Sequence, residues 1–297
     1  MKLVRFGEAG KERPGIWLER AGEPAAIVDV NAMVFDIADY DAHFWRSGGV
    51  ARLRGLLGES RLKTVPADGV RLGVPVVPGQ VIAAGKNYAA HAREFDGSRG
   101  RPGEPVFFAK SVGSLWGPFD DIPLPPEAKE VDAEAELAFV LGKAPRAGCR
   151  PEEAAEAIAG WCVMNDLTDR GRQARDGQWF AAKSRRGFGP IGPWVVTADE
   201  FGVSAARDTA VTQRLNGVTM QDGRTREWLT GAGALLAAIA AVVPMEAGDV
   251  VSTGTPGGIG SRRNPPIYLR HGDVVECSVW GVGTIRNRVV RVERGRG

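Results

Sequence analysis

Two glutamates form the first group of side chains in this chain that could do chemistry. Glu134 and Glu136 lie in the segment 131–141, where polar and apolar residues alternate as in a β-strand. Both carboxylates therefore project from one face of the predicted strand, while Leu137 and Phe139 face the other way. Two adjacent negative charges repel each other unless a cation or a proton neutralises them. A divalent metal ion is the simplest partner.

A third carboxylate extends this candidate metal site. Asp166 ends the apolar run 160–165, which predicts a second strand. Three carboxylates would make the hard, oxygen-rich site that magnesium, calcium or manganese prefers. Spacing alone favours a less specific interpretation, because glutamates that alternate along a strand usually form the solvated face of an edge strand.

The remaining segments predict a β-rich α+β fold in which curved strands pack as a sandwich or roll with a few helices outside. The Asn-Gly pair at 216–217 is typical of a hairpin turn. Asn87 is suited to begin a helix over 87–95. Strands are expected at 16–20, 25–30, 81–85, 105–110, 192–197, 249–253, 273–279 and 283–290, and further helices at 51–57, 151–160 and 226–242.

Composition narrows the class of protein. The 297 residues include 38 basic and 36 acidic side chains, a net charge of +2, so no global field draws nucleic acid or an anionic membrane. No apolar run approaches the roughly 20 residues of a membrane span. Only three cysteines occur, which argues against a disulfide framework and fits a reducing cytoplasm.

A proline- and glycine-rich stretch over 65–79 suggests a domain boundary. We therefore expect a small N-terminal α+β domain over 1–72 and a catalytic domain over 73–297. A loop rich in glycine and proline is expected over 97–103.

Two further features have ordinary alternatives. His91 and Glu94 share one helix face, a spacing most often found in surface ion pairs. The glycine-rich loop 254–260 lacks the Gly-Lys-Ser/Thr ending of a phosphate-binding loop, so nucleotide binding is not predicted.

Several segments in a fixed order resemble the fumarylacetoacetate hydrolase family over about residues 75–295, in particular its acylpyruvase and 2-keto-3-deoxy sugar acid hydrolase branch. The matching segments are 85–91, 131–137 (Val-Asp-Ala-Glu-Ala-Glu-Leu), 165–168, 183–184, 189–194 and 252–258 (Ser-Thr-Gly-Thr-Pro-Gly-Gly). The resemblance implies a mixed β-sandwich roll with flanking helices.

The resemblance also implies roles for individual residues. Glu134, Glu136 and Asp166 match metal ligands that hold Mg²⁺ or Mn²⁺ and leave room for the oxygens of a 2-oxo acid. His91 and Glu94 match a catalytic pair on a lid, in which Glu94 orients His91 and His91 takes a proton from water. The other implied residues are Lys183, which would hold a carboxylate or an oxyanion near the metal, and the substrate-binding candidates Lys86, Tyr88, Lys110, Arg170, Gln173 and Thr255.

This chain departs from the family pattern at two places. Gly171 follows Arg170 where many relatives have an acid, and Arg185 and Arg186 follow Lys183-Ser184 where an aromatic residue and an Asp are common. The two arginines favour an anionic distal end of the substrate, or they face solvent; both interpretations stay open.

The implied activity is metal-dependent hydrolysis of a carbon–carbon bond in a 2,4-diketo acid of the acylpyruvate type, giving pyruvate and a carboxylic acid. Related chemistry leaves three alternatives: decarboxylation of oxaloacetate, isomerisation or hydration of a 2-hydroxy-dienoate, and, in another class, non-catalytic binding of a 2-oxo acid. A homodimer is expected because the family commonly forms one.

Overall fold

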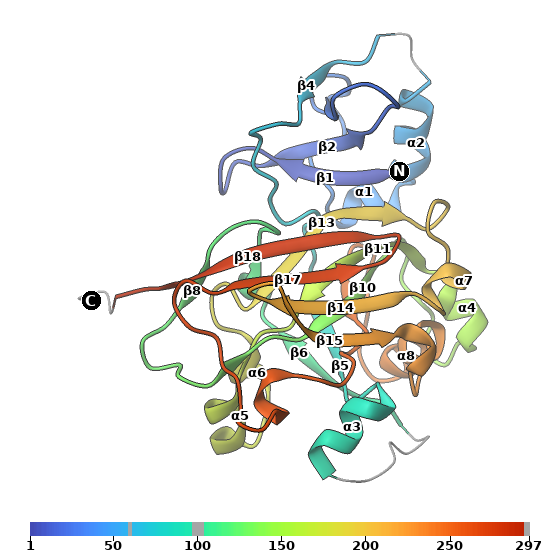
Figure 1. Ribbon diagram of the computed structural model, residues 1–297. Coiled ribbons are helices and arrows are strands. Elements are labelled where there is room, and N and C mark those ends of the chain that lie inside the picture. The colour runs from blue at the N-terminus through green and yellow to red at the C-terminus, as the bar shows by residue number, and fades with distance from the viewer. Residues whose placement is uncertain (59–60, 97–103, 294–297) are drawn as a thin grey trace.

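One long, mostly antiparallel sheet runs through the molecule in the computed structural model, which describes residues 1–58, 61–96 and 104–293 (Figure 1). The loop expected over 97–103 lies outside these residues. In order across the sheet, the strands are β4 (Thr64–Pro66), β3 (Ala26–Asp29), β2 (Arg13–Leu18), β1 (Lys2–Phe6), β13 (Gly189–Thr197), β11 (Ile158–Asn165), β10 (Ala135–Leu141), β16 (Val250–Ser252), β5 (Val81–Gly85) and β6 (Val106–Lys110), with β7 (Leu115–Trp116) beside β13.

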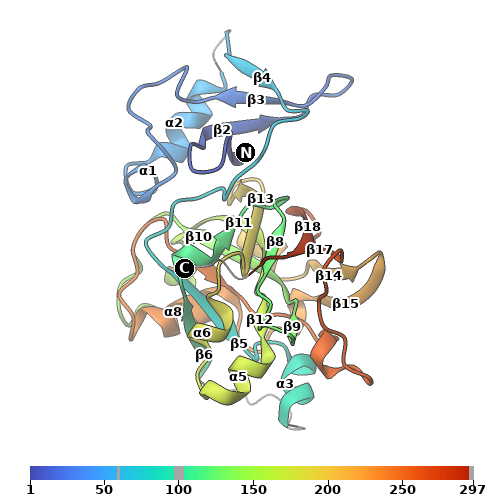
Figure 2. The same cartoon turned by 90° about the vertical axis from the view of Figure 1, so that its left-hand side faces the viewer.

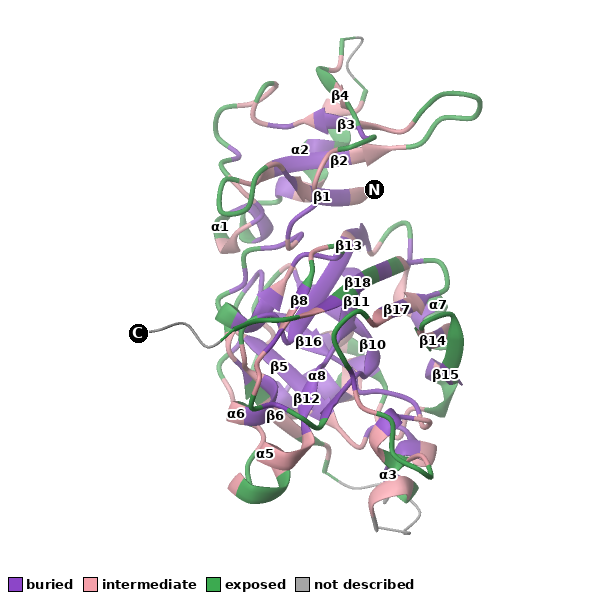
Figure 3. Cartoon of the chain, turned by 60° about the vertical axis from the view of Figure 1, so that its left-hand side comes forward, coloured by how far each residue is buried: buried purple, intermediate pink, exposed green. Residues whose placement is uncertain are grey.

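A second sheet packs against the first and encloses the main core. Its strands, in order, are β15 (Val218–Arg224), β14 (Ala210–Leu215), β17 (Val274–Val279), β18 (Gly283–Arg291) and β8 (Ile122–Leu124), while β9 (Val131–Asp132) and β12 (Thr168–Asp169) form a separate pair. Phe139 and Trp161 of the long sheet share one buried cluster with Val211 and Ile285 of the second (Figure 3). The predicted β-rich sandwich is confirmed.

The hairpin between β14 and β15 follows from its two turn residues. Asn216 and Gly217 have φ values of 53° and 82°, the left-handed region that this tight turn requires. The Asn-Gly prediction is therefore confirmed.

The helices predicted over 151–160 and 226–242 are shorter than the sequence suggests, whereas those predicted over 51–57 and 87–95 have nearly the expected length. The helices are α1 (Ala42–Arg46), α2 (Gly49–Leu56), α3 (Ala89–Asp96), α4 (Pro151–Ala155), α5 (Arg170–Asp176), α6 (Phe180–Lys183), α7 (Val203–Ala206) and α8 (Ala232–Ala240), with single 3₁₀ turns at η1 (Val112–Ser114), η2 (Thr225–Glu227) and η3 (Gly260–Arg262). The helix expected over 151–160 ends at Ala155 because β11 begins at Ile158. None of the helices in the described part of the chain has the length and apolar character needed to cross a membrane.

Two predictions fail at Asn87. Its side chain does not begin the helix; its amide donates to the backbone oxygens of Thr230 (3.0 Å) and Thr253 (2.8 Å). The backbone N–H groups of Leu229 and Thr230 bond back to Asn87. Trp228 also forms an isolated antiparallel bridge with Tyr88 at the start of α3, and residues 229–230 bend, so the helix predicted from 226 does not begin until α8 at Ala232.

The N-terminal strands continue the sheet that carries the site. β1 pairs antiparallel with β13, with Leu3 opposite Val195. Leu3 and Ile16 also share a buried cluster with Val140 and Ile191. Figure 2 shows β2–β4, α1 and α2 at one end of the molecule and α3, α5 and α6 at the other. The assignment of residues 1–72 to a separate domain stays a prediction.

Candidate active site

The two glutamates lie in the middle of the long sheet. Glu134 immediately precedes β10, Glu136 lies within it, and β10 is paired on both sides, with β11 and β16. Both residues are buried. The interpretation of this segment as a solvated edge strand is therefore wrong, and the burial of two adjacent carboxylates requires compensating charge.

Strand pairing brings the third carboxylate to them. In the ladder between β10 and β11, Ala135 lies opposite Asn165, and the N–H of Asp166 donates to the carbonyl oxygen of Glu134 at 2.9 Å. One oxygen from each of Glu134, Glu136 and Asp166 lies within 4.8 Å of the others. The three carboxylates thus converge as the sequence predicts.

Two buried lysines supply part of the balancing charge. Lys183 Nζ lies 2.6 Å from both Glu134 Oε2 and Asp166 Oδ2, and 2.8 Å from Thr168 Oγ1. Lys110 Nζ lies 2.6 Å from the other oxygen of Asp166 and donates to the backbone oxygens of Lys183 and Phe188. The lysines therefore hold Asp166 from two sides.

The two glutamates differ in their charge partners. Burial opposes the ionisation of Glu134, but Arg170 and Lys183 outweigh it and hold the pKa of Glu134 below its ordinary value. Burial, Asp166 and Glu134 raise the pKa of Glu136 well above its ordinary value. Glu136 accepts hydrogen bonds from Ser252 Oγ and, at 3.0 Å, from the N–H of Gly254.

The donor set fits a hard divalent cation. Each of the three carboxylates offers oxygen, the ligand atom that such ions prefer. Glu136 forms no salt bridge with any described residue, and a cation among the three oxygens would supply the charge that it lacks.

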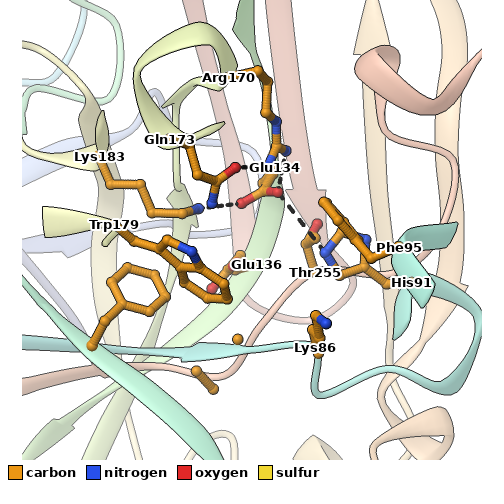
Figure 4. Close-up of a pocket in the computed structure, with 13 residues that line it drawn as sticks. Lys86, His91, Phe95, Glu134, Glu136, Arg170, Gln173, Trp179, Lys183 and Thr255 are labelled. Atoms are coloured by element: carbon orange, nitrogen blue, oxygen red, sulfur yellow. Dashed lines mark hydrogen bonds and ion pairs between the residues drawn. The ribbon is translucent and has the colours of Figure 1, made fainter. Parts of the chain in front are cut away.

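A histidine faces these carboxylates from α3 (Figure 4). His91 Nδ1 lies 3.0 Å from Glu94 Oε2, and His91 Nε2 lies 3.9 Å from Glu134 Oε1. The other oxygen of Glu94 accepts the N–H of Gly258 at 2.6 Å. The glycine-rich loop therefore anchors Glu94, and Glu94 fixes the orientation of His91.

Arg170 reaches the same cluster from the start of α5. Its guanidinium donates to Glu134, to Asp132 Oδ2 (3.1 Å) and to Gln173 Oε1 (3.0 Å). Thr255 Oγ1 donates to the carbonyl oxygen of Ala135 at 2.9 Å. These bonds fix Arg170 and Thr255 in the wall of a cavity.

The cavity itself is small and opens into a wider vestibule. The inner part encloses about 30 Å³, whereas the vestibule encloses about 440 Å³ and shares residues such as Lys86, Phe95 and Trp179 with it. The predicted site residues that line the inner part are Lys86, His91, Glu134, Glu136, Arg170, Gln173, Lys183 and Thr255.

The comparison with known families agrees with this arrangement. The model described as Fumarylacetoacetate (FAA) hydrolase C-terminal matches residues 80–290. The chain belongs to the fumarylacetoacetate hydrolase family. The resemblance predicted from the sequence segments is thus confirmed.

Similar proteins in this family carry several activities in their names. The mitochondrial oxaloacetate tautomerase Fahd2a of Rattus norvegicus is 35% identical over 98% of this chain and 92% of its own length. The structure of a fumarylacetoacetate hydrolase from Exiguobacterium antarcticum has a TM-score of 0.81 and 35% identity, and covers 98% of this chain and 100% of its own. That of a 5-carboxymethyl-2-hydroxymuconate delta-isomerase from Mycobacterium smegmatis has a TM-score of 0.76 and 32% identity, with 99% and 100% covered.

Two residues that family membership suggested for substrate binding lie behind the cavity. Lys110 is buried under Asp166 and does not line the space. Tyr88 is fully buried, and its ring packs edge-on against Trp228 with centroids 6.4 Å apart. Both positions are suited to holding the walls of the site rather than to touching a ligand.

The two arginines that depart from the family pattern do not line the cavity or its vestibule. Arg185 pairs with Asp169 and Glu127, and Arg186 stacks on Trp116 at 5.4 Å from the ring centroid. These contacts argue against the interpretation that the arginines bind the distal end of a substrate.

Sequence reasoning missed the aromatic walls and one carboxylate. Phe95, Phe108 and Trp179 line the cavity. The packing of this wall requires a glycine at position 85, because an added Cβ there would lie 2.4 Å from the Trp179 ring; the sequence shows the glycine but not the ring it faces. Asp132 continues the same alternation as the glutamates and is also buried, so its spacing could have found it.

The glycine-rich loop organises these carboxylates. Its N–H groups at Gly254 and Gly258 bind Glu136 and Glu94, and those of Gly260 and Ser261 bind the two oxygens of Asp132 at 3.0 Å each. The loop therefore serves as an anion-binding element whose anions are side chains of the site itself.

Proposed function

We propose that this protein is a metal-dependent hydrolase that cleaves a carbon–carbon bond in an acylpyruvate-like 2,4-diketo acid and releases pyruvate and a carboxylic acid. The observation that carries this proposal is the position of His91. Its Nε2 faces the buried carboxylates across the cavity while Glu94 holds Nδ1 at 3.0 Å. A base fixed opposite a cation site is what activation of water at a chelated keto acid requires.

The proposed cofactor is Mg²⁺ or Mn²⁺, held by Glu134, Glu136 and Asp166. When bound there, such a cation supplies a Lewis acid that polarises the 2-oxo group of the substrate. Arg170, Gln173 and Lys183 line the same inner space; Arg170 and Gln173 would donate to the acid group of the substrate, and Lys183 would contribute its positive charge.

The chain's own residues carry the proton chemistry. The contact with Glu94 leaves Nε2 of His91 to accept a proton from water. The water oxygen then adds to the carbonyl carbon distal to the acid group. The bond from that carbon to the methylene between the two ketones breaks; the distal fragment leaves as the carboxylic acid. The methylene carbon keeps the electron pair and takes up the proton that His91 accepted from water, which gives pyruvate and restores the histidine.

The shape of the site supports a substrate that extends beyond its 2-oxo acid end. The inner space of about 30 Å³ accommodates only a small group beside the carboxylates, whereas the vestibule of about 440 Å³ lies directly outside it. The 2-oxo acid end of the substrate would occupy the inner space, and the distal acyl group would occupy the vestibule. The shared aromatic walls, Phe95 and Trp179, favour an apolar portion between the two.

A second candidate is an oxaloacetate tautomerase, because a relative 35% identical over 98% of this chain carries that name. The same histidine could move a proton between carbon and oxygen without adding water. Assays with a panel of acylpyruvates and with oxaloacetate, with and without chelator, distinguish the two. Chelator-sensitive release of pyruvate from an acylpyruvate supports the hydrolase. Enol–keto conversion of oxaloacetate without acylpyruvate cleavage refutes the hydrolase.

We also propose that the protein works in the cytoplasm as a homodimer. Its three cysteines, Cys149, Cys162 and Cys277, are all buried free thiols, which suits a reducing compartment. The mass of the protein in solution, measured by light scattering, tests the dimer, and a monomeric mass would refute it.

A further inference from the structure

Asp132 is a buried carboxylate for which the proposed mechanism has no role. It ends β9, is 3% exposed, and lies two positions before Glu134. Its Oδ1 accepts the N–H groups of Ala133 and Gly260 at 2.9 and 3.0 Å. Its Oδ2 accepts the N–H of Ser261 at 3.0 Å and two donors of Arg170. Five donors on one carboxylate hold it in a single orientation.

Arg170 is shared between this carboxylate and a proposed metal ligand. Its Nη2 donates both to Asp132 Oδ2, at 3.1 Å, and to Glu134 Oε1, whereas its Nε donates to Asp132 alone, at 3.3 Å. A guanidinium placed fully on Glu134 would compete with a cation for the same oxygen. The position of Asp132 therefore limits how many hydrogen bonds Arg170 donates to Glu134.

We propose that Asp132 is a positioning residue that sets the metal affinity of the site by holding Arg170 partly away from Glu134. The inference rests on the cation site of the proposed function, and it concerns metal affinity rather than the reaction. Because the backbone N–H groups of Gly260 and Ser261 anchor Asp132, Arg170 has one partner whose position does not depend on the metal ligands.

The test measures binding of Mn²⁺ to the full chain by electron paramagnetic resonance, which needs no turnover. Asp132→Asn removes the negative charge that attracts Arg170, so the arginine moves toward Glu134. We expect Mn²⁺ to bind about 10-fold more weakly, a typical effect for a group that supports a metal ligand. In Arg170→Gln the competitor is gone, so Mn²⁺ should bind at least as tightly as in the wild type.

The double variant separates positioning from simple structural support. Once Arg170 is replaced, Asp132→Asn should cause no further loss, because the residue acts through the arginine. Asp249→Asn is the matched control: it is 1% exposed, accepts bonds from Gln80 and Glu246, and contacts none of these residues. It should lower stability without changing Mn²⁺ affinity.

Three results would overturn the inference: unchanged Mn²⁺ affinity in Asp132→Asn, an equal loss in the presence and absence of Arg170, or weaker binding in Arg170→Gln. The last measurement applies even if Asp132→Asn does not fold. A wild-type protein that binds no Mn²⁺ overturns both the inference and the proposed cofactor. A wild-type protein that binds Mn²⁺ but cleaves no diketo acid overturns the proposed hydrolase alone.

Discussion

His91 Nε2 lies 3.9 Å from Oε1 of Glu134 across the cavity. The histidine comes from α3 and the glutamate from the start of β10, so the two sides of the site belong to different layers of the molecule. The hydrogen bond from the N–H of Gly258 to Glu94 fixes the position of α3 relative to the glycine-rich loop. A base on one side and a cation site on the other can therefore be altered separately.

Replacement of Glu136 should strongly weaken metal binding. Glu136→Gln keeps the volume and the acceptor for Gly254 but removes the negative charge, so we expect affinity for Mn²⁺ to fall about 100-fold or more. Calorimetric titration of Mn²⁺ measures this. Glu152→Gln, an exposed position on α4, is the control and should bind as the wild type does. Full Mn²⁺ affinity in Glu136→Gln would exclude this residue as a ligand.

Replacement of His91 should affect turnover rather than metal binding. In His91→Gln the proton acceptor is lost, and kcat should fall about 100- to 10,000-fold, the usual contribution of a general base. Glu94→Gln should lower kcat by less, because it disturbs only the orientation of the ring. Parallel measurements of kcat and Mn²⁺ affinity check both variants. A histidine variant that turns over normally but binds metal poorly would contradict the assigned role.

Metal binding should become tighter as the pH rises. Burial and the neighbouring carboxylates raise the pKa of Glu136 well above its ordinary value, so a cation must displace a proton from it. In chelator-treated protein, a raised carboxyl pKa stabilises the fold fully below the ordinary carboxyl pKa, and this stabilisation is lost as the pH rises through the raised value.

The corresponding measurement compares Tm with Mn²⁺ and with chelator across a pH series. The gain in Tm on adding Mn²⁺ should widen from acid to neutral pH. Calorimetry in buffers of different ionisation enthalpy should show proton release on binding. A gain that is constant with pH, with no proton release, would exclude a protonated carboxyl in the site.

Alanine at position 85 should reshape the cavity wall. An added Cβ there would lie 2.4 Å from the Trp179 ring, so this ring must shift within the cavity. We expect KM for the substrate to rise several-fold and stability to fall by about 1–3 kcal/mol, as for overpacked sites.

Gly55→Ala is the control for this variant. Position 55 lies in α2 with open space around the added methyl group, so the substitution should be neutral or stabilise by about 0.5–1 kcal/mol. Urea denaturation and steady-state kinetics measure both changes. An unchanged KM in Gly85→Ala would mean that Trp179 does not contact the substrate.

Some of the site follows from local periodicity. The alternation that places Glu134 and Glu136 on one face requires only a strand, and the pleat of any strand gives it. The Asn216-Gly217 turn requires only left-handed backbone, which these two residue types adopt readily. Such features were predicted because each depends on residues that are adjacent in the sequence.

The sequence was wrong, or left alternatives open, where contacts between distant segments decide the outcome. Asn87 has the composition of a helix start, yet its amide is taken by Thr230 and Thr253. The sequence left open whether Arg185 and Arg186 bind substrate or face solvent, whereas in the structure Arg185 pairs with Asp169 and Glu127 and Arg186 stacks on Trp116. No pattern within a segment reports which distant partner will reach it.

The sequence by itself determined the family, the strand-rich architecture and the direction of the carboxylates, because these depend on residue type and spacing. Only the tertiary structure decided that the backbone N–H of Asp166 bonds to the carbonyl oxygen of Glu134, that loop amides bind Glu94, Glu136 and Asp132, and that Arg170 donates to both Asp132 and Glu134. Those relations arise from the antiparallel pairing of β10 with β11 and from the path of the glycine-rich loop. They depend on contacts between remote segments, and local periodicity carries no information about such contacts.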